Sequence, residues 1–135
     1  MIGIILITHG GIGMELLSAL EHIVGKQENI ATIGIKPSDK VEKKRIEIIE
    51  AVNKVRGEGG VVLLTDMFGG TPSNLAISVM NEPNVEVLAG ANLPMLIQLA
   101  RIREDTTLIK AVKEAKEAGQ KYINLASELL AERNG

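Results

Sequence analysis

In two short stretches of this chain, a chemically active side chain stands two residues after a buried-type apolar run and is soon followed by glycines. His9 follows the run at 4–7, and Asp66 follows the run at 61–64. Continuous apolar, β-branched runs of this length are typical of strands buried on both faces of a parallel sheet. Because open α/β sheets bind their ligands where the strands end, we expect His9 and Asp66 to belong to one site.

The residue types in this pair suit phosphoryl chemistry. A neutral imidazole at a strand end is a good nucleophile toward phosphorus, provided that an acceptor holds one of its ring nitrogens as N–H. Asp66 is the natural acceptor, since a carboxylate on one nitrogen fixes the tautomer and raises the basicity of the other. We therefore predict that His9 and Asp66 are the catalytic residues.

The glycines around this pair predict an anion site. Glycine leaves backbone N–H groups unshielded, and a helix that begins just after each turn adds the positive end of its dipole. Hydroxyl groups in the second turn could add further donors. Phosphoryl transfer depends mostly on positioning and charge stabilisation, so such a site can work without a metal. The candidate phosphate-binding residues are Gly10, Gly11, Gly69, Gly70, Thr71 and Ser73.

Other interpretations of each half of the site must be weighed. A lone histidine after a strand is often structural, and an aspartate before two glycines is often a loop or cap residue. The dinucleotide-binding pattern fails, because Leu16 stands where its third glycine belongs. The phosphate-loop pattern and the nucleophile pattern of serine hydrolases are absent. The combination of the two strand ends therefore favours the phosphoryl interpretation.

Composition narrows the class of protein. The 135 residues predict one domain, 1–135, with a net charge of −2 that gives no electrostatic case for nucleic acid or an anionic membrane surface. Cysteine is absent and there are only two histidines, which speaks against a metal cluster and fits a reducing cytoplasm. No apolar run is long enough to cross a bilayer, so we expect no membrane insertion.

Strand-like and helix-like patterns alternate along the chain, which predicts an α/β fold: an open parallel sheet with helices on both faces. We expect strand order 2-1-3-4, which places the strands before His9 and Asp66 side by side. Thr71 is the expected N-cap of the third helix, with Pro72 following it, and Gly119 is expected to end the fifth. The predicted strands are 4–7, 30–35, 61–64, 85–88 and a short one at 122–125; the predicted helices are 15–24, 41–55, 75–80, 95–103, 108–118 and 126–133.

Three motifs together carry a family resemblance. They are Thr8-His9-Gly10, then Thr65-Asp66-Met67-Phe68-Gly69-Gly70-Thr71-Pro72-Ser73-Asn74, and then the stretch 89–96. With them the chain resembles, over nearly its whole length, the IIA domain of the mannose/fructose/sorbose branch of the bacterial sugar phosphotransferase system.

The resemblance implies a specific function. His9 would be phosphorylated on Nε2 by the phosphocarrier protein and would pass the group to a histidine of a IIB domain for sugar uptake, while Asp66 holds Nδ1–H. The family is cytoplasmic, uses no cofactor and forms homodimers in which a C-terminal strand, here 122–125, crosses to the partner's sheet. An intrachain pairing of that strand is the alternative.

Two departures from the family pattern concern its partner surfaces. Many members carry an aromatic residue soon after the histidine and a tryptophan in the aspartate loop, where this chain has Gly11 and Phe68.

Three other functions stay open: a regulatory module that binds proteins according to the phosphorylation of His9, the phosphoryl-donor domain of a dihydroxyacetone kinase, and a flavodoxin-like binder of small ligands. For the kinase domain we expect serine in place of Gly10 and Gly11.

Overall fold

The computed structural model describes residues 1–134, which form four strands and six helices. In chain order the elements are β1 (Gly3–His9), α1 (Ile12–Val24), β2 (Ile30–Ile35), α2 (Val41–Val55), β3 (Val61–Thr65), α3 (Thr71–Ser78), β4 (Val85–Ala89), α4 (Leu93–Ile102), α5 (Leu108–Lys121) and α6 (Ala126–Asn134).

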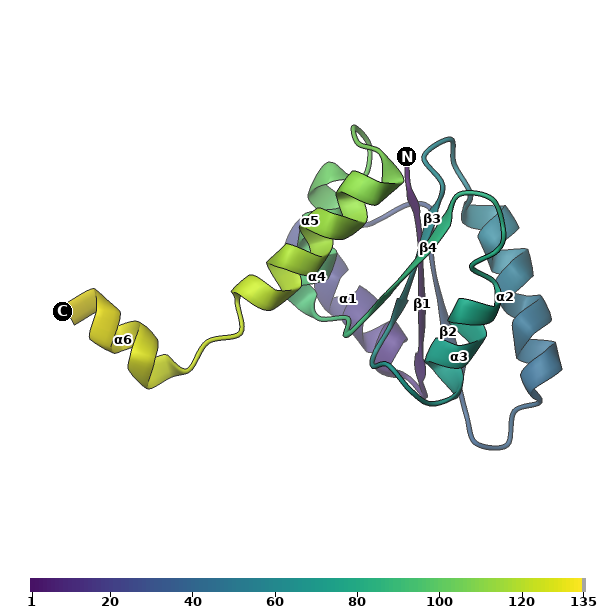
Figure 1. Cartoon of the computed structure of the whole chain (residues 1–135), viewed down its shortest axis with the longest axis horizontal. Coiled ribbons are helices and arrows are strands. Elements are labelled where there is room, and N and C mark those ends of the chain that lie inside the picture. Colours follow the sequence, from purple (N-terminus) through teal and green to yellow (C-terminus); the bar gives the residue numbers. More distant parts are fainter. Residues whose placement is uncertain (135) are drawn as a thin grey trace.

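The four strands form one parallel sheet in the order β2-β1-β3-β4, as the sequence predicts. Helices α2 and α3 cover one face, and α1, α4 and α5 cover the other (Figure 1). The two central strands are buried on both sides, since six of the seven residues of β1 and all five of β3 are buried. This burial explains why their sequences are continuous apolar runs rather than alternating ones.

Two apolar layers hold the helices to the sheet. Ile5, Ile7 and Leu63 point toward α2 and α3, while Ile4 and Leu6 point toward α1 and α4. Alternate residues of β1 thus feed opposite layers, as the two-residue period of a strand requires. His9 is the first residue of β1 that emerges from this packing.

The opposite end of β1 is fixed by a buried arginine that the sequence patterns do not reveal. Arg103, only 2% exposed, donates hydrogen bonds to the Ile2 and Asn29 carbonyl oxygens and to Gln27 Oε1. A buried guanidinium is costly unless its donors are satisfied, and here three of them have acceptors. Arg103 therefore ties the start of β1 to the loop before β2.

Two predicted features differ in the structure. Gly119 does not end α5; the helix continues to Lys121, and Gly119 is buried where a Cβ would approach Met95 Cε to 3.0 Å. The glycine thus lets Met95 of α4 pack closely against α5 and is not a C-cap. Residues 122–125 form no strand within the described chain, because they lead from α5 to α6 without a pairing partner. Exchange of that segment in a dimer stays a prediction.

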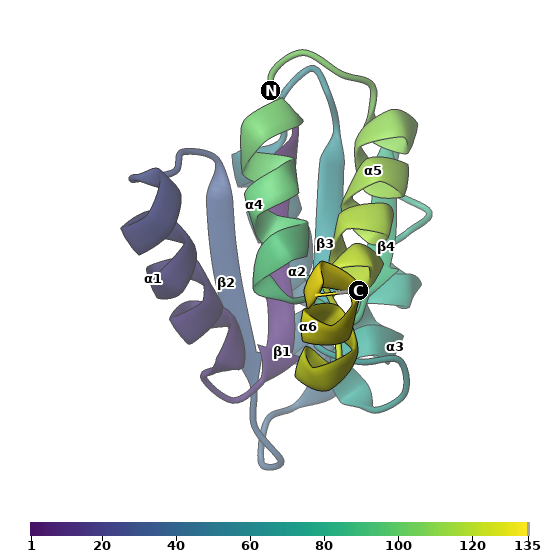
Figure 2. The same cartoon turned by 90° about the vertical axis from the view of Figure 1, so that its left-hand side faces the viewer.

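Helix α6 stands apart from the rest of the fold at the end of this linking segment (Figure 1), and it lies in front of the domain when that side faces the viewer (Figure 2). Among the described residues, no helix combines the length and the hydropathy needed to cross a bilayer.

Candidate functional site

The predicted pair of catalytic side chains comes together at the carboxyl end of the sheet. His9 Nδ1 lies 2.8 Å from Asp66 Oδ2, and the same oxygen accepts the His9 backbone N–H at 3.1 Å. The adjacency of β1 and β3 produces this contact, since the two strands are paired in register from Gly3 to Ile7. One carboxylate oxygen therefore fixes both the backbone and the ring of His9.

This contact determines which nitrogen of His9 is available. An ionised carboxylate can only accept hydrogen bonds, so Nδ1 is protonated and its N–H donates to Asp66 Oδ2, while Nε2 keeps its lone pair. The His9 side chain is 48% exposed, whereas that of Asp66 is 13% exposed. The arrangement presents an oriented, nucleophilic nitrogen to solvent and keeps its carboxylate behind it.

The environment of Asp66 keeps it ionised. Burial raises the pKa of this carboxyl group, but the hydrogen bonds from the His9 side chain and backbone outweigh burial, and the pKa lies below its ordinary value. Oδ1 of the same carboxylate is buried and has no hydrogen-bond partner among the described residues. Both hydrogen bonds that the Asp66 side chain accepts in the described structure thus come from His9.

The first glycine turn differs from the prediction. The Gly10 N–H donates to the Ile35 carbonyl oxygen at 2.9 Å, so it is not a free phosphate donor, and Gly10 has a positive φ of 49°. The Gly13 N–H is also occupied, because the buried Thr8 hydroxyl accepts it at 2.8 Å. Sequence reasoning missed this role of Thr8, because the contact depends on how the turn at 10–11 folds back over the end of β1. Gly11, the N-cap of α1, remains a candidate donor.

The second turn passes directly over the ring of His9. Gly69 and Gly70 have φ angles of 87° and 83°, which strain any residue other than glycine. A Cβ on Gly70 would lie 3.2 Å from His9 Nε2, so the missing side chain leaves this nitrogen uncovered. The turn therefore requires glycine for its conformation and for access to the nucleophile.

The start of α3 corrects two expectations. Gly70 is the N-cap, and Thr71 is the first helical residue instead of the cap. Ser73 is fully buried, and its hydroxyl donates to the Gly70 carbonyl oxygen at 3.4 Å, so it supports the turn instead of facing the surface. Thr71 is exposed and keeps its hydroxyl at the surface.

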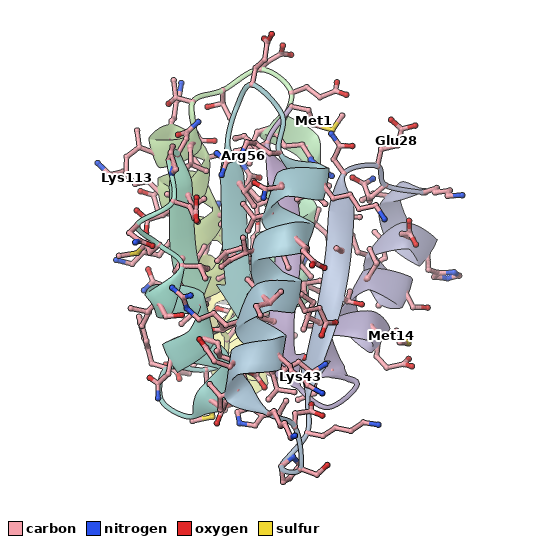
Figure 3. All side chains as sticks on the ribbon, turned by 90° about the vertical axis from the view of Figure 1, so that its right-hand side faces the viewer. Met1, Met14, Glu28, Lys43, Arg56 and Lys113 are labelled. Carbon is pink, nitrogen blue, oxygen red and sulfur yellow. The ribbon has the colours of Figure 1, made fainter. Side chains whose placement is uncertain are left out.

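Exposed apolar side chains flank the histidine on both loops. They belong to the first turn of α1 and to the loop between β3 and α3. Met14 lies at the end of the molecule opposite Met1 (Figure 3), which is the end where β1 finishes. We call this set the apolar rim; its members are Ile12, Met14, Met67 and Phe68.

Fold and site together define a class: an open α/β domain that presents one carboxylate-oriented imidazole at a glycine-lined switch point between two central strands. Comparison with known sequences identifies the family. The family model described as "PTS system fructose IIA component", where PTS denotes the phosphotransferase system, matches residues 3–116, and the chain belongs to this family.

Relatives of known name agree with this assignment. The chain is 34% identical over 105 residues to the "PTS system mannose-specific EIIAB component" of Escherichia coli K12, covering 77% of this chain but only 32% of that protein. It is 28% identical to the "PTS system fructose-specific EIIA component" of Bacillus subtilis, covering 96% of this chain and 90% of that one. It thus spans about a third of the E. coli protein and most of the B. subtilis protein.

Solved structures share the whole fold. The EIIA component from Streptococcus agalactiae superposes with a TM-score of 0.86 at 27% identity, covering 95% of this chain and 99% of that one. The mannose/sorbose-specific IIA subunit from Enterococcus faecalis gives a TM-score of 0.81 at 25% identity, with 91% and 92% covered.

Proposed function

We propose that this protein is a phosphohistidine relay subunit for sugar uptake. His9 Nε2 attacks the phosphorus of a phosphohistidine on the phosphocarrier protein, so that a new N–P bond forms as the N–P bond of the carrier breaks. In the second step a histidine of a IIB domain attacks the phosphorus, the bond between phosphorus and His9 Nε2 breaks, and His9 returns to its neutral state with the lone pair back on Nε2. The 2.8 Å contact between His9 Nδ1 and Asp66 Oδ2 is the observation that carries the proposal.

Each step has a residue to support it. Asp66 stabilises the positive charge that develops on the imidazole as Nε2 forms its bond to phosphorus. The Gly11 and Gly70 amides and the Thr71 hydroxyl are the proposed donors to the phosphoryl oxygens. No metal is needed in this scheme, because the charge is carried by fixed donors. The half-exposed ring suits a phosphoryl group that arrives on another protein, and we place the relay in the cytoplasm.

We propose further that the protein is a homodimer joined through its C-terminal segment. Tyr122, Ile123 and Leu125 are all exposed, as are two leucines of α6. A segment with this many apolar side chains in water is unfavourable unless another surface covers it. A second copy of the chain provides that surface when the segment at 122–125 adds to the edge of its sheet, the exchange that the family resemblance implies.

The proposal is tested by phosphorylation in solution. The protein is incubated with phosphoenolpyruvate, the first enzyme of the system and the carrier, and the product is mapped by mass spectrometry. We expect acid-labile phosphate on His9, which the variant His9→Ala abolishes. His22, the other histidine of the chain, is exposed on α1, so His22→Ala is a matched control that retains labelling. Labelling that persists in His9→Ala would remove the assignment.

A further inference from the structure

A lysine-rich stretch leads from β2 into α2. Residues 36–45 contain five basic and two acidic side chains, in a chain whose net charge is −2. Lys44 is already paired, since its Nζ lies 3.1 Å from Glu47 Oε2 and 3.8 Å from Asp39 Oδ2. Three other lysines are exposed and form no ion pair among the described residues. We call them the lysine cluster; its members are Lys36, Lys40 and Lys43.

The stability of α2 does not account for the lysine cluster. Lys40 is the N-cap of this helix, and its side chain accepts no hydrogen bond from a backbone amide. The N-terminus of a helix is the positive end of its dipole, so cations there are unfavourable, and Ser, Thr, Asp or Asn is the usual cap. Glu42 is the only acidic residue of the first turn, and Lys43 follows it directly. Cations at this position therefore indicate a role in contacts with another molecule.

The lysine cluster begins beside the turn that follows His9. In the register of β1 and β2, His9 pairs with Ile35, and the Ile35 carbonyl oxygen accepts the Gly10 N–H at 2.9 Å. Lys36 is the next residue. Its N–H donates to Asp39 Oδ2 at 2.7 Å, which closes the loop before α2 into a tight turn. The start of the lysine cluster is thus held against the glycine turn of the histidine site.

The other end of the lysine cluster borders the second loop of the site. Val41 and Thr71 line one groove of about 260 Å³ between α2 and α3. Lys43, two residues after Val41, lies at the same end of the molecule as Met14 of the apolar rim (Figure 3). Exposed charges act on an approaching anion over about one Debye length, which is roughly 8 Å at physiological ionic strength. The lysine cluster is therefore placed to attract an anionic group that approaches His9 from the α2 side.

We propose that the lysine cluster is a docking surface for a protein that carries a phosphoryl group, and that it distinguishes the phosphorylated carrier from the dephosphorylated one. The inference rests on the proposed function and names the charge that the site selects. A phosphoryl group carries roughly two negative charges near neutral pH, and lysine binds phosphate as a point charge. The carrier loses this charge when His9 takes its phosphoryl group. Its attraction to the lysine cluster then falls, and it dissociates faster.

The test removes the three charges from the full chain with Lys36→Gln, Lys40→Gln and Lys43→Gln together. We expect the second-order rate constant for phosphorylation of His9 by the phosphorylated carrier to fall on the order of tenfold at low salt. The rate at saturating carrier should stay near the native one. The difference should disappear near about 1 M salt, where the Debye length is roughly 3 Å. Urea titrations should show no loss of stability, because the removed charges lie at the positive end of the α2 dipole.

The matched control removes the same net charge from exposed lysines elsewhere. Its substitutions are Lys54→Gln, Lys110→Gln and Lys113→Gln. Lys54 lies in the last turn of α2, and Lys113 lies toward the end of the molecule that carries Met1, away from Lys43 (Figure 3). We expect this variant to keep the native second-order rate constant.

A binding comparison isolates the charge of the phosphoryl group. The variant His9→Ala accepts no phosphate, so calorimetry with it measures carrier binding without transfer. We expect its affinity for the phosphorylated carrier to exceed that for the dephosphorylated carrier on the order of tenfold. Adding the three substitutions of the lysine cluster should remove most of this ratio.

The possible results separate the two proposals. An equal loss of rate in the control would mean that only the net charge matters, and a native rate constant in the lysine-cluster variant would mean that its charges are not used; either would overturn the inference. An equal loss of affinity for both forms of the carrier would also overturn it, because an acidic carrier surface would then be the bound group. Failure of the native chain to accept phosphate on His9 would instead remove the proposed function, and the affinity ratio in His9→Ala would still decide the inference.

Discussion

Replacement of Asp66 by asparagine is the sharpest test of the site, because the structure determines what each orientation of the amide would do. If the amide nitrogen faces His9, it meets two N–H donors in the place of Oδ2, and both hydrogen bonds are lost. If the amide oxygen faces His9, the nitrogen takes the buried position of Oδ1, which has no partner among the described residues. Either orientation loses the charge that stabilises the imidazolium.

The size of the effect follows from these contacts. A hydrogen bond to a charged group contributes about 1.5 to 3 kcal/mol. The His9 side chain is 48% exposed, so solvent screens the interaction and the lower end of this range applies. A loss of about 1.5 kcal/mol in the transition state corresponds to a rate roughly tenfold lower. We therefore expect Asp66→Asn to slow phosphorylation of His9 by at least about tenfold.

The assay is a quench-flow measurement of phosphate transfer from the phosphorylated carrier, at several carrier concentrations so that binding and transfer are separated. Circular dichroism checks that the variant is folded. Asp105→Asn, which changes an exposed carboxylate away from the site, is the matched control and keeps the native rate. A rate for Asp66→Asn within twofold of the native rate would refute the orienting role of the carboxylate.

Three further outcomes are expected. Gly70→Ala should destabilise the fold by about 1 to 3 kcal/mol in urea titrations, because the φ of 83° and ψ of 173° at position 70 suit glycine alone. The same substitution should slow phosphorylation of His9, because the added Cβ crowds Nε2. Gly11→Ala, at a position with a φ of −86°, should change stability less. The stabilisation that Asp66 contributes should be complete above its unfolded pKa of about 3.8 and should disappear as the pH falls through its lower folded pKa, so urea titrations of the native protein and of Asp66→Asn should converge in acid. Arg103→Met should lower stability by about 1 to 3 kcal/mol, because it removes the guanidinium donor from the carbonyl oxygen of the buried Ile2, while the folded fraction labels His9 at the native rate.

Much of the architecture could be predicted because its signals are local. The apolar runs before His9 and Asp66 mark the two central strands. Because the carboxyl ends of parallel strands lie at the same edge of a sheet, the two side chains were expected to meet there, as they do. The sheet order was predictable for the same reason, since it is the arrangement that brings these ends together.

The remaining features depend on contacts between distant parts of the chain. The Gly10 amide is occupied because β2 ends beside it, which no pattern around Gly10 reveals. Ser73 and Arg103 are polar residues that the fold buries, and their partners are backbone carbonyl groups whose positions exist only in the folded molecule. Gly119 has the sequence appearance of a helix end, but the close approach of Met95 gives it a packing role inside α5.

The single uncovered nitrogen of His9 also limits the order in which partner proteins can bind. Under the proposed function, donor and acceptor must both reach Nε2 past the same Gly70 turn, so they cannot be bound at once. Each phosphoryl transfer then requires one partner protein to dissociate before the next one binds. The dephosphorylated carrier competes with the IIB domain for the same surface around His9. Fast throughput therefore favours short-lived complexes of modest affinity, whose dissociation rates govern the flow of phosphate.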